Sequence, residues 1–166
     1  MSSRVLHLPD SSVLFTLQDG GLISYLWELG LSIGTVDLIL AEWKACLQST
    51  LISAGLQVKS LTGPELAALF TLAPSHKCIS PVDLSLFVYA IHHPGCMIIT
   101  GDQRLRCLCE YHGQPVHGVL WLMDALHEKG VISGPDLADS LEEMIEKGSF
   151  LPEGDCGRRI KTWREG

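Results

Sequence analysis

The sequence has no long hydrophobic run and no recognisable export signal. None of its apolar stretches approaches the roughly 18 uncharged residues that a membrane-spanning helix needs. The opening MSSRVLHLPD lacks the long apolar segment and the small-residue cleavage site of a secretory signal. We therefore expect a cytoplasmic protein without membrane contacts.

Basic charge is scarce in the chain. The sequence has 12 Lys and Arg residues against 19 Asp and Glu, so the formal net charge is −7 at pH 7. A broad nucleic-acid-binding surface normally needs clustered Lys and Arg. Any nucleic acid must therefore meet a local basic patch, or cations that the protein holds.

Repeats, low-complexity segments and flexible linkers are also missing. A chain of 166 residues buries about two-thirds of its unfolded surface without help from disulfides or structural metals. We therefore expect one domain over residues 1–166, in which residues 131–166 form a C-terminal helical extension and tail. Because no export signal is present, we expect the six cysteines to remain reduced thiols.

Short apolar segments alternate with longer helical patterns along the chain. The expected strands cover residues 4–8, 31–36, 56–61, 96–100 and 114–117. Strands that alternate with helices predict a mostly parallel sheet with helices on both faces. The predicted fold class is therefore α/β, a three-layer α/β/α sandwich with a central, mostly parallel sheet.

Local signals mark the ends of several expected helices. The stretch SPVD at residues 80–83 predicts a capping box and a helix that runs to about His92. Further helices are expected over residues 61–72, 118–130 and 134–148. The final segment, SFLPEGDCGRRIKTWREG, loses this periodicity and gathers basic residues, which predicts a flexible tail or a docking arm.

Four acidic residues occupy positions at or near expected strand ends and helix starts, where their side chains could bind a ligand or take part in a reaction. Asp10 and Asp102 each follow an expected strand and precede a helix. Asp83 lies in the first turn of its helix, and Glu42 is expected inside a helix that begins near Asp37. Taken singly, each has a structural explanation as a helix cap, as part of a capping box or as a solvated charge.

Taken together, the four carboxylates suggest a metal site. The carboxyl ends of parallel strands and the helix N-termini that follow them form the usual ligand crevice of such a sheet. Carboxylates that crowd together repel one another unless something neutralises them, and sites made only of oxygen favour Mg²⁺ or Mn²⁺. Such ions support phosphodiester hydrolysis.

Four motifs in this order resemble the PIN-domain family of metal-dependent ribonucleases. They are LPDSSVL, LILAEW, ISPVDLSLFVYAI and IITGDQRLRCLCEYHG, and the resemblance runs from about residue 4 to residue 130. It implies that Asp10, Glu42, Asp83 and Asp102 are the catalytic residues and hold one or two Mg²⁺ or Mn²⁺ ions. It further implies hydrolysis of RNA to products with a 5′-phosphate and a 3′-hydroxyl.

The resemblance also assigns supporting residues. Ser12 and Thr100 fall where the family often has hydroxyl side chains, and either could orient a carboxylate or a water molecule. Arg104 and Arg106 follow the last aspartate and could contact RNA phosphates, although solvated helix charges are an equally good interpretation.

The region HGVLWLMDALHEKGVIS resembles an extension found in bacterial and archaeal PIN proteins of the VapC-like toxin type. This resemblance implies a toxin of a toxin–antitoxin pair, with a small antitoxin protein as partner. The GVLWLMD stripe is apolar enough to pack on the sheet or on another copy, so we also expect a homodimer.

Three other hypotheses remain open from the sequence. The chain could be a non-catalytic PIN-like binding or regulatory module that acts through a protein partner. It could be a different Mg²⁺-dependent phosphohydrolase, although the expected Asp-X-Asp motif is missing after the first strand. A zinc site could use Cys107, Cys109, His112 and His117, but cysteines two apart on a helix face different directions.

Overall fold

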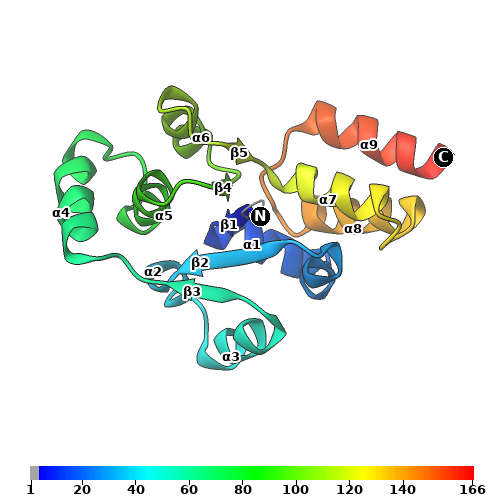
Figure 1. Ribbon diagram of the computed structural model, residues 1–166. Coiled ribbons are helices and arrows are strands. Elements are labelled where there is room, and N and C mark those ends of the chain that lie inside the picture. The colour runs from blue at the N-terminus through cyan, green and yellow to red at the C-terminus, as the bar shows by residue number, and fades with distance from the viewer. Residues whose placement is uncertain (1–3) are drawn as a thin grey trace.

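The computed structural model describes residues 4–166 and contains all five expected strands (Figure 1). They are β1 (Leu6–Pro9), β2 (Ser32–Val36), β3 (Gln57–Lys59), β4 (Cys96–Ile99) and β5 (Val116–His117). The strands form one sheet in the order β3-β2-β1-β4-β5, and every neighbouring pair is parallel. The predicted parallel α/β sheet is confirmed.

Helices connect the strands and extend the chain beyond β5. The α-helices are α1 (Ser11–Asp19), α2 (Asp37–Leu40), α3 (Ala45–Ala54), α4 (Gly63–Leu72), α5 (Pro81–His92), α6 (Gln103–Tyr111), α7 (Val119–Glu128), α8 (Gly134–Glu146) and α9 (Glu153–Glu165). Two 3₁₀ helices, η1 (Ile23–Leu29) and η2 (Ala73–Ser75), complete the set within residues 4–166. The helices expected over residues 61–72, 80–92, 118–130 and 134–148 are all present.

The sheet separates two hydrophobic cores, which gives the three layers. Leu8 and Ile98 point to the side covered by α4, α5 and α6. Ile33 and Ile99 point to the opposite side, where α1, α7 and α8 pack. This alternation follows from the pleat of a strand, which sends successive side chains to opposite faces. Figure 1 shows the sheet between these helical layers.

Glu42 does not lie in a helix, which corrects the sequence prediction. Helix α2 ends at Leu40, and Glu42 is an exposed residue of the turn that follows. The next residue, Trp43, is buried, and its ring stacks on that of Phe15 with 4.2 Å between centroids. A tight turn, in which the Trp43 N–H bonds to the Leu40 carbonyl, brings the indole inward and ends the helix.

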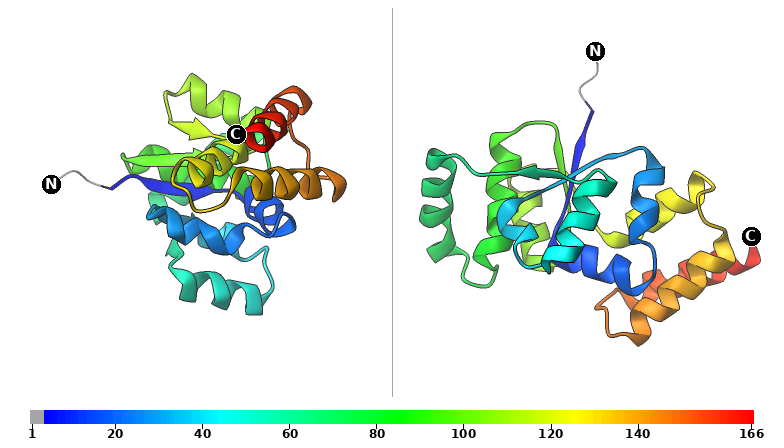
Figure 2. Two further views of the ribbon diagram at one scale, coloured as in Figure 1. Left: turned by 90° about the vertical axis from the view of Figure 1, so that its right-hand side faces the viewer. Right: turned by 90° about the horizontal axis from the view of Figure 1, so that it is seen from below.

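The prediction of a flexible tail is wrong for residues 153–165, because they form helix α9. Cys156 and Trp163 are buried and Ile160 is partly buried, so the apolar positions recur at the i, i+4, i+7 spacing of one helix face. Only these three apolar residues mark the buried face among many polar ones, so the sequence pattern did not indicate a helix. Both views in Figure 2 place α9 beside α8.

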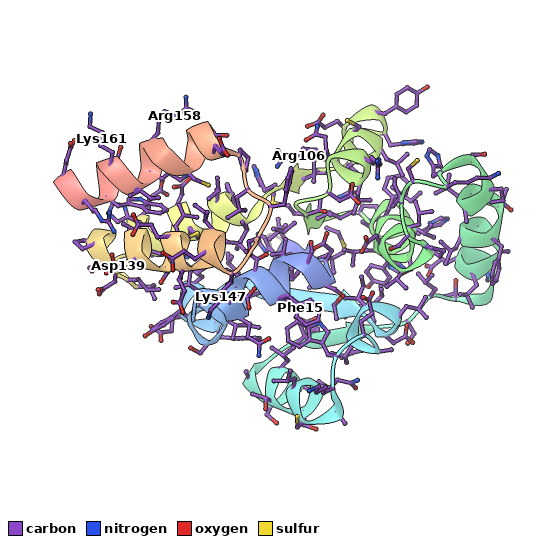
Figure 3. The ribbon with its side chains drawn as sticks, turned by 180° about the vertical axis from the view of Figure 1, so that it is seen from behind. Phe15, Arg106, Asp139, Lys147, Arg158 and Lys161 are labelled. Atoms are coloured by element: carbon purple, nitrogen blue, oxygen red, sulfur yellow. The ribbon has the colours of Figure 1, made fainter. Side chains whose placement is uncertain are left out.

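The arginines of this segment form ion pairs with acidic residues of the same chain. Arg159 makes a forked ion pair with Asp124 of α7, with contacts of 2.7 and 3.0 Å. Arg164 reaches Asp139 and Glu142 of α8 at 2.7 to 2.9 Å. The segment therefore docks on its own molecule, while the side chains of Arg158 and Lys161 project from the outer side of α9 (Figure 3).

The apolar stripe of α7 is also covered within the chain. Leu122, Met123 and Leu126 are buried in the core shared with α1, η1 and α8. The stripe therefore packs internally, which was the first of its two predicted uses, and it offers no support for a homodimer. Among residues 4–166, no helix is long and apolar enough to cross a membrane.

Candidate active site

Asp10 lies at the carboxyl end of β1 and caps the N-terminus of α1. Its Oδ1 accepts hydrogen bonds from the Val13 backbone N–H at 2.9 Å and the Ser12 hydroxyl at 2.8 Å. Its Oδ2 accepts the Thr100 hydroxyl at 2.5 Å. The residue is only 1% exposed, and this burial raises the pKa of its carboxyl although the three hydrogen bonds lower it.

Thr100 connects Asp10 to the neighbouring acidic residue. It follows β4, and its hydroxyl oxygen accepts the Asp102 backbone N–H at 3.0 Å while donating to Asp10. Asp102 in turn caps α6, and its Oδ1 accepts the backbone N–H groups of Arg104 at 2.8 Å and Leu105 at 3.3 Å. Since β1 and β4 are paired, the two strand ends place these groups side by side.

Asp83 approaches the same place from the first turn of α5. Ser80 caps this helix by accepting the Asp83 backbone N–H at 3.1 Å, as the sequence predicted. Within residues 4–166, the Asp83 carboxylate does not accept a returning hydrogen bond from the Ser80 backbone N–H, in contrast to the complete capping box of α4. The Asp83 carboxylate therefore remains available to the site.

The pKa of Asp83 reflects both its burial and its acidic surroundings. Its pKa is raised from the ordinary value of 3.8 to about 6, first by burial and then by the charges of Asp10, Glu42 and Asp102. Repulsion from a like charge disfavours ionisation. The other three predicted acids thus repel the charge of Asp83, and a cation beside Asp83 would relieve that repulsion.

A groove of about 540 Å³ runs over this group of acids. Asp83, Asp102, Ser12 and Arg104 line it, together with Phe150 from the loop between α8 and α9. Asp10 lies beneath the groove, held by Ser12 and by Thr100. Glu42 is not among the lining residues, so the structure places it near the site but outside the groove.

The four acids lie in or near one groove without forming a ready-made coordination sphere. Among residues 4–166, no three His, Cys, Asp or Glu side chains are close enough to hold a metal ion as they stand. The donor chemistry nevertheless fits a hard divalent cation, since every candidate ligand is a carboxylate oxygen. In the described part of the chain, Oδ2 of Asp102 accepts no hydrogen bond and could serve as a ligand.

The two predicted phosphate-binding arginines point to different places. Arg104 lines the acidic groove, and its guanidinium donates to the Cys78 carbonyl at 3.3 Å. Arg106 is half-buried and lines a second cavity of about 320 Å³. Figure 3 places its side chain between α6 and the chain that leads into α9.

The zinc hypothesis finds no support in the structure. The buried Cys109 thiol has its pKa raised to about 12, chiefly by desolvation, so it resists forming the thiolate that binds zinc. Cys107 is exposed, in keeping with the opposite directions predicted for the two residues. All six cysteines are free thiols, as expected.

Comparison with known families gives a match to almost the whole chain. A family model described as a PIN domain covers residues 7–165. The chain belongs to the PIN-domain family. No curated protein matches the sequence.

Membership of this family bears on the site in a general way. PIN domains are generally nucleases, and they typically use divalent metal ions. The match extends through α8 and α9, whereas the sequence motifs resembled the family only to about residue 130. Helices α8 and α9, whose connecting loop borders the groove, are therefore part of the PIN domain.

Sequence reasoning missed Phe150, which borders both cavities. Its side chain is 99% exposed. In hindsight the signal is an aromatic residue in the loop GSFLPEG, outside any helical or strand periodicity. Trp121 also lines the second cavity and stacks on His117 at 4.6 Å between ring centroids.

Proposed function

We propose that this PIN domain is a Mg²⁺- or Mn²⁺-dependent ribonuclease that hydrolyses RNA phosphodiester bonds. Asp10, Asp83 and Asp102, with Glu42 from outside the groove, would hold one or two ions. Ser12 and Thr100 would support the carboxylates, and Arg104 and Arg106 would contact phosphates on either side of the cleaved bond.

One observation carries this proposal. Asp83 and Asp102 line one groove with Asp10 beneath it, and burial, followed by repulsion from the charges of Asp10, Glu42 and Asp102, raises the pKa of Asp83 to about 6. Such repulsion is costly unless a cation or a proton offsets it. A functional site for a divalent cation explains why the chain keeps these charges together.

The residues of the chain would divide the work of hydrolysis. When bound, a divalent ion supplies positive charge that stabilises the phosphoryl oxygens and eases deprotonation of an attacking water. Hydrogen bonds from Thr100 and Ser12 hold the Asp10 carboxylate in one orientation. The water oxygen bonds to phosphorus, the bond to the 3′-oxygen breaks, and that oxygen takes a proton.

The biological setting follows as part of the same proposal. The resemblance of residues 117–133 to VapC-like proteins suggests a toxin whose activity a small antitoxin restrains. We also propose a cytoplasmic location and a homodimer, whose interface would have to differ from the internally packed stripe of α7.

Cleavage of labelled single-stranded RNA with Mg²⁺ or Mn²⁺ tests the activity. Asp102→Asn keeps a good helix cap, and Asp83→Asn keeps the shape of the side chain. Asp136→Asn is a matched control, because Asp136 occupies the same first-turn position after a capping serine in α8. We expect EDTA and the first two substitutions to abolish cleavage, and the control to cleave like the parent.

The same experiment separates the proposal from the non-catalytic alternative. If several RNAs stay intact with every variant and metal, the site is not a ribonuclease. Capture of a protein partner without metal-dependent cleavage would then favour the binding or regulatory module.

A further inference from the structure

The cavity next to the acidic groove is lined by arginine, aromatic and acidic side chains. It lies between α6, α7 and the loop before α9, and its volume of about 320 Å³ is at the lower end of the usual range for small-molecule sites. It shares Asp102, Val119 and Phe150 with the acidic groove. A strand bound at the acids could therefore continue into this cavity without a break.

Phe150 is held at the rim of both cavities by its neighbours. Ser149 is anchored twice, through its backbone N–H to the Met144 carbonyl at 3.0 Å and through its hydroxyl to Thr16 at 3.4 Å. On the other side, Leu151 packs against the core. The phenyl ring between them is 99% exposed, so its whole face is available to a flat partner.

A positive charge, that of Arg106, also lines the cavity. The Arg106 guanidinium lies above Gly118, where an added Cβ would be 3.4 Å from Nη2. Among residues 4–166, Arg106 has no carboxylate within ion-pair distance, whereas Arg159 in the same cavity is paired with Asp124. Arg106 is thus the cavity's unpaired cation.

An exposed aromatic ring beside an unpaired arginine suits single-stranded nucleic acid. Bases stack on aromatic side chains whatever their identity, and arginine neutralises the backbone phosphate. A protein partner could also pack on an exposed Phe. It would not explain an unpaired arginine in a cavity that opens to a carboxylate groove. These observations favour RNA over a protein ligand.

We propose that this cavity is a nucleotide subsite of the ribonuclease, in which Phe150 stacks on a base of single-stranded RNA and Arg106 contacts its phosphate. The inference rests on the proposed function and adds to it a preference for unpaired RNA. A base that stacks on Phe150 cannot be paired within a duplex. The subsite would place the adjoining phosphate in the acidic groove.

Fluorescence anisotropy with a labelled 12-nucleotide single-stranded RNA measures this contact. The measurements use the full chain carrying Asp102→Asn, with Mg²⁺, so that the RNA stays intact. Phe150→Ala should weaken binding about 5- to 100-fold, the usual loss for one stacked base. Phe150→Trp should restore it. Phe70→Ala is the control, because Phe70 is also exposed (73%) but lies on α4, at the opposite end of the molecule (Figure 1).

RNAs with one abasic position, scanned along the strand, identify the stacked base. At one position of the strand, removal of the base should weaken binding to the protein that keeps Phe150 as much as Phe150→Ala does. The same abasic RNA should bind Phe150→Ala no more weakly than the intact RNA does. Equal binding by Phe150→Ala and Phe70→Ala, or no rescue by Trp, would overturn the subsite. A change in the size-exclusion elution volume of Phe150→Ala without a change in its RNA affinity would also overturn the subsite, because it would indicate that Phe150 contacts protein.

Cleavage by the chain with intact acids, measured in parallel, separates the two proposals. If the parent cleaves RNA and Phe150→Ala cleaves and binds equally well, the subsite is wrong and the nuclease stands. If the parent neither binds nor cleaves RNA, both proposals fail.

Discussion

At the scale of single residues, one hydroxyl group joins two of the acidic positions. Thr100 donates to Asp10 and accepts from the backbone of Asp102, so one side chain supports both strand ends. Asp10 is buried, and a buried carboxylate that loses a donor is left unpaired away from water. The orientation of the acids therefore depends on a residue that carries no charge.

Replacing Thr100 with valine tests this support. Thr100→Val keeps the shape of the side chain but removes the hydroxyl, so we expect the free energy of unfolding to fall by about 1–3 kcal/mol. Cleavage should fall about 10- to 100-fold, as it does when supporting residues of metal sites are changed. Urea denaturation and RNA cleavage measure the two effects. Thr100→Ser should stay close to the parent, and equal loss in both variants would contradict the role of the hydroxyl.

Asp83 should make the metal-free protein less stable than it could be. Its folded pKa of about 6 lies above the ordinary 3.8, so the folded chain holds this proton more tightly than the unfolded chain does. Stability from this group is therefore lost as the pH rises from about 4 to 6. In EDTA at pH 7.5, Asp83→Asn should raise the free energy of unfolding on the order of 1 kcal/mol, after allowance for solvent screening.

Thermal unfolding of Asp83→Asn and the Asp136→Asn control, with EDTA or Mg²⁺, provides the measurement. Mg²⁺ should stabilise the parent and the control more than Asp83→Asn. A variant that is less stable than the parent in EDTA at pH 7.5 would show that repulsion is not the dominant effect.

At the scale of elements, Glu65 ties two helices together. Its carboxylate accepts the Thr62 backbone N–H at 2.9 Å, which completes the capping box of α4, and contacts His93 after α5 at 2.7 Å. The Thr62 hydrogen bond is the largest cause that lowers the pKa of this carboxyl. The stabilisation is therefore present above the ordinary pKa of about 4.5 and is lost as the pH falls through the lower folded value.

Glu65→Gln should lower the free energy of unfolding by about 1 kcal/mol near neutral pH, the usual worth of a helix cap. The difference from the parent should shrink as the pH is taken below 4.5, because the parent carboxylate then becomes protonated. Denaturant titrations across that range measure the difference. The exposed Glu128→Gln serves as the control, and a difference that does not vary with pH would contradict the assignment.

Helices α8 and α9 meet at a glycine. An added Cβ at Gly134 would clash with the backbone carbonyl of Trp163, which cannot move aside as a side chain could. At Gly157, on the exposed side of α9, the space around an added Cβ is open. The same substitution therefore has opposite expected effects at the two positions.

Gly134→Ala should destabilise the protein by about 1–3 kcal/mol, the usual range for overpacking. Gly157→Ala should stabilise it by up to about 1 kcal/mol, because alanine is the better helix former. Thermal or urea unfolding of both variants tests the packing of α9 on α8. If both substitutions stabilise the chain, the two helices are not in contact as described.

At the scale of the whole molecule, the proposed function requires an acidic protein to bind an acidic polymer. The net charge of −7 leaves few cations for RNA, and all three arginines of α9 are paired with acids of the same chain. RNA binding should therefore depend on a small number of local contacts and on divalent ions. Such an interface predicts a weak dependence on monovalent salt.

The salt dependence of RNA affinity measures the number of these contacts. For single strands the logarithm of the association constant falls by about 0.7 per phosphate contact for each tenfold rise in salt. Two contacts, from Arg104 and Arg106, predict a slope of about −1.4, and Arg106→Ala should reduce its magnitude by about 0.7. Lys161→Ala, on the outer side of α9, should leave the slope unchanged. A steep slope that Arg106→Ala does not alter would point to a different binding surface.

Much of this architecture could be predicted from the sequence, because local patterns carry it. Alternating strand and helix periods indicated all five strands and the parallel sheet. The positions of Asp10 and Asp102 after strands, and of Asp83 in a first turn, were predicted because capping is a local interaction. Their catalytic roles remain proposals.

The tertiary structure alone decided how these pieces meet. The Thr100–Asp10 hydrogen bond spans 90 residues of sequence, and burial of Trp43 moved Glu42 out of a helix. Helix α9 forms where only three apolar residues mark its buried face, because α7 and α8 supply the surface and the acids that it packs against. Periodicity and caps act between neighbours in the chain, whereas a groove and the exposure of Phe150 depend on distant residues that come together only in the folded chain.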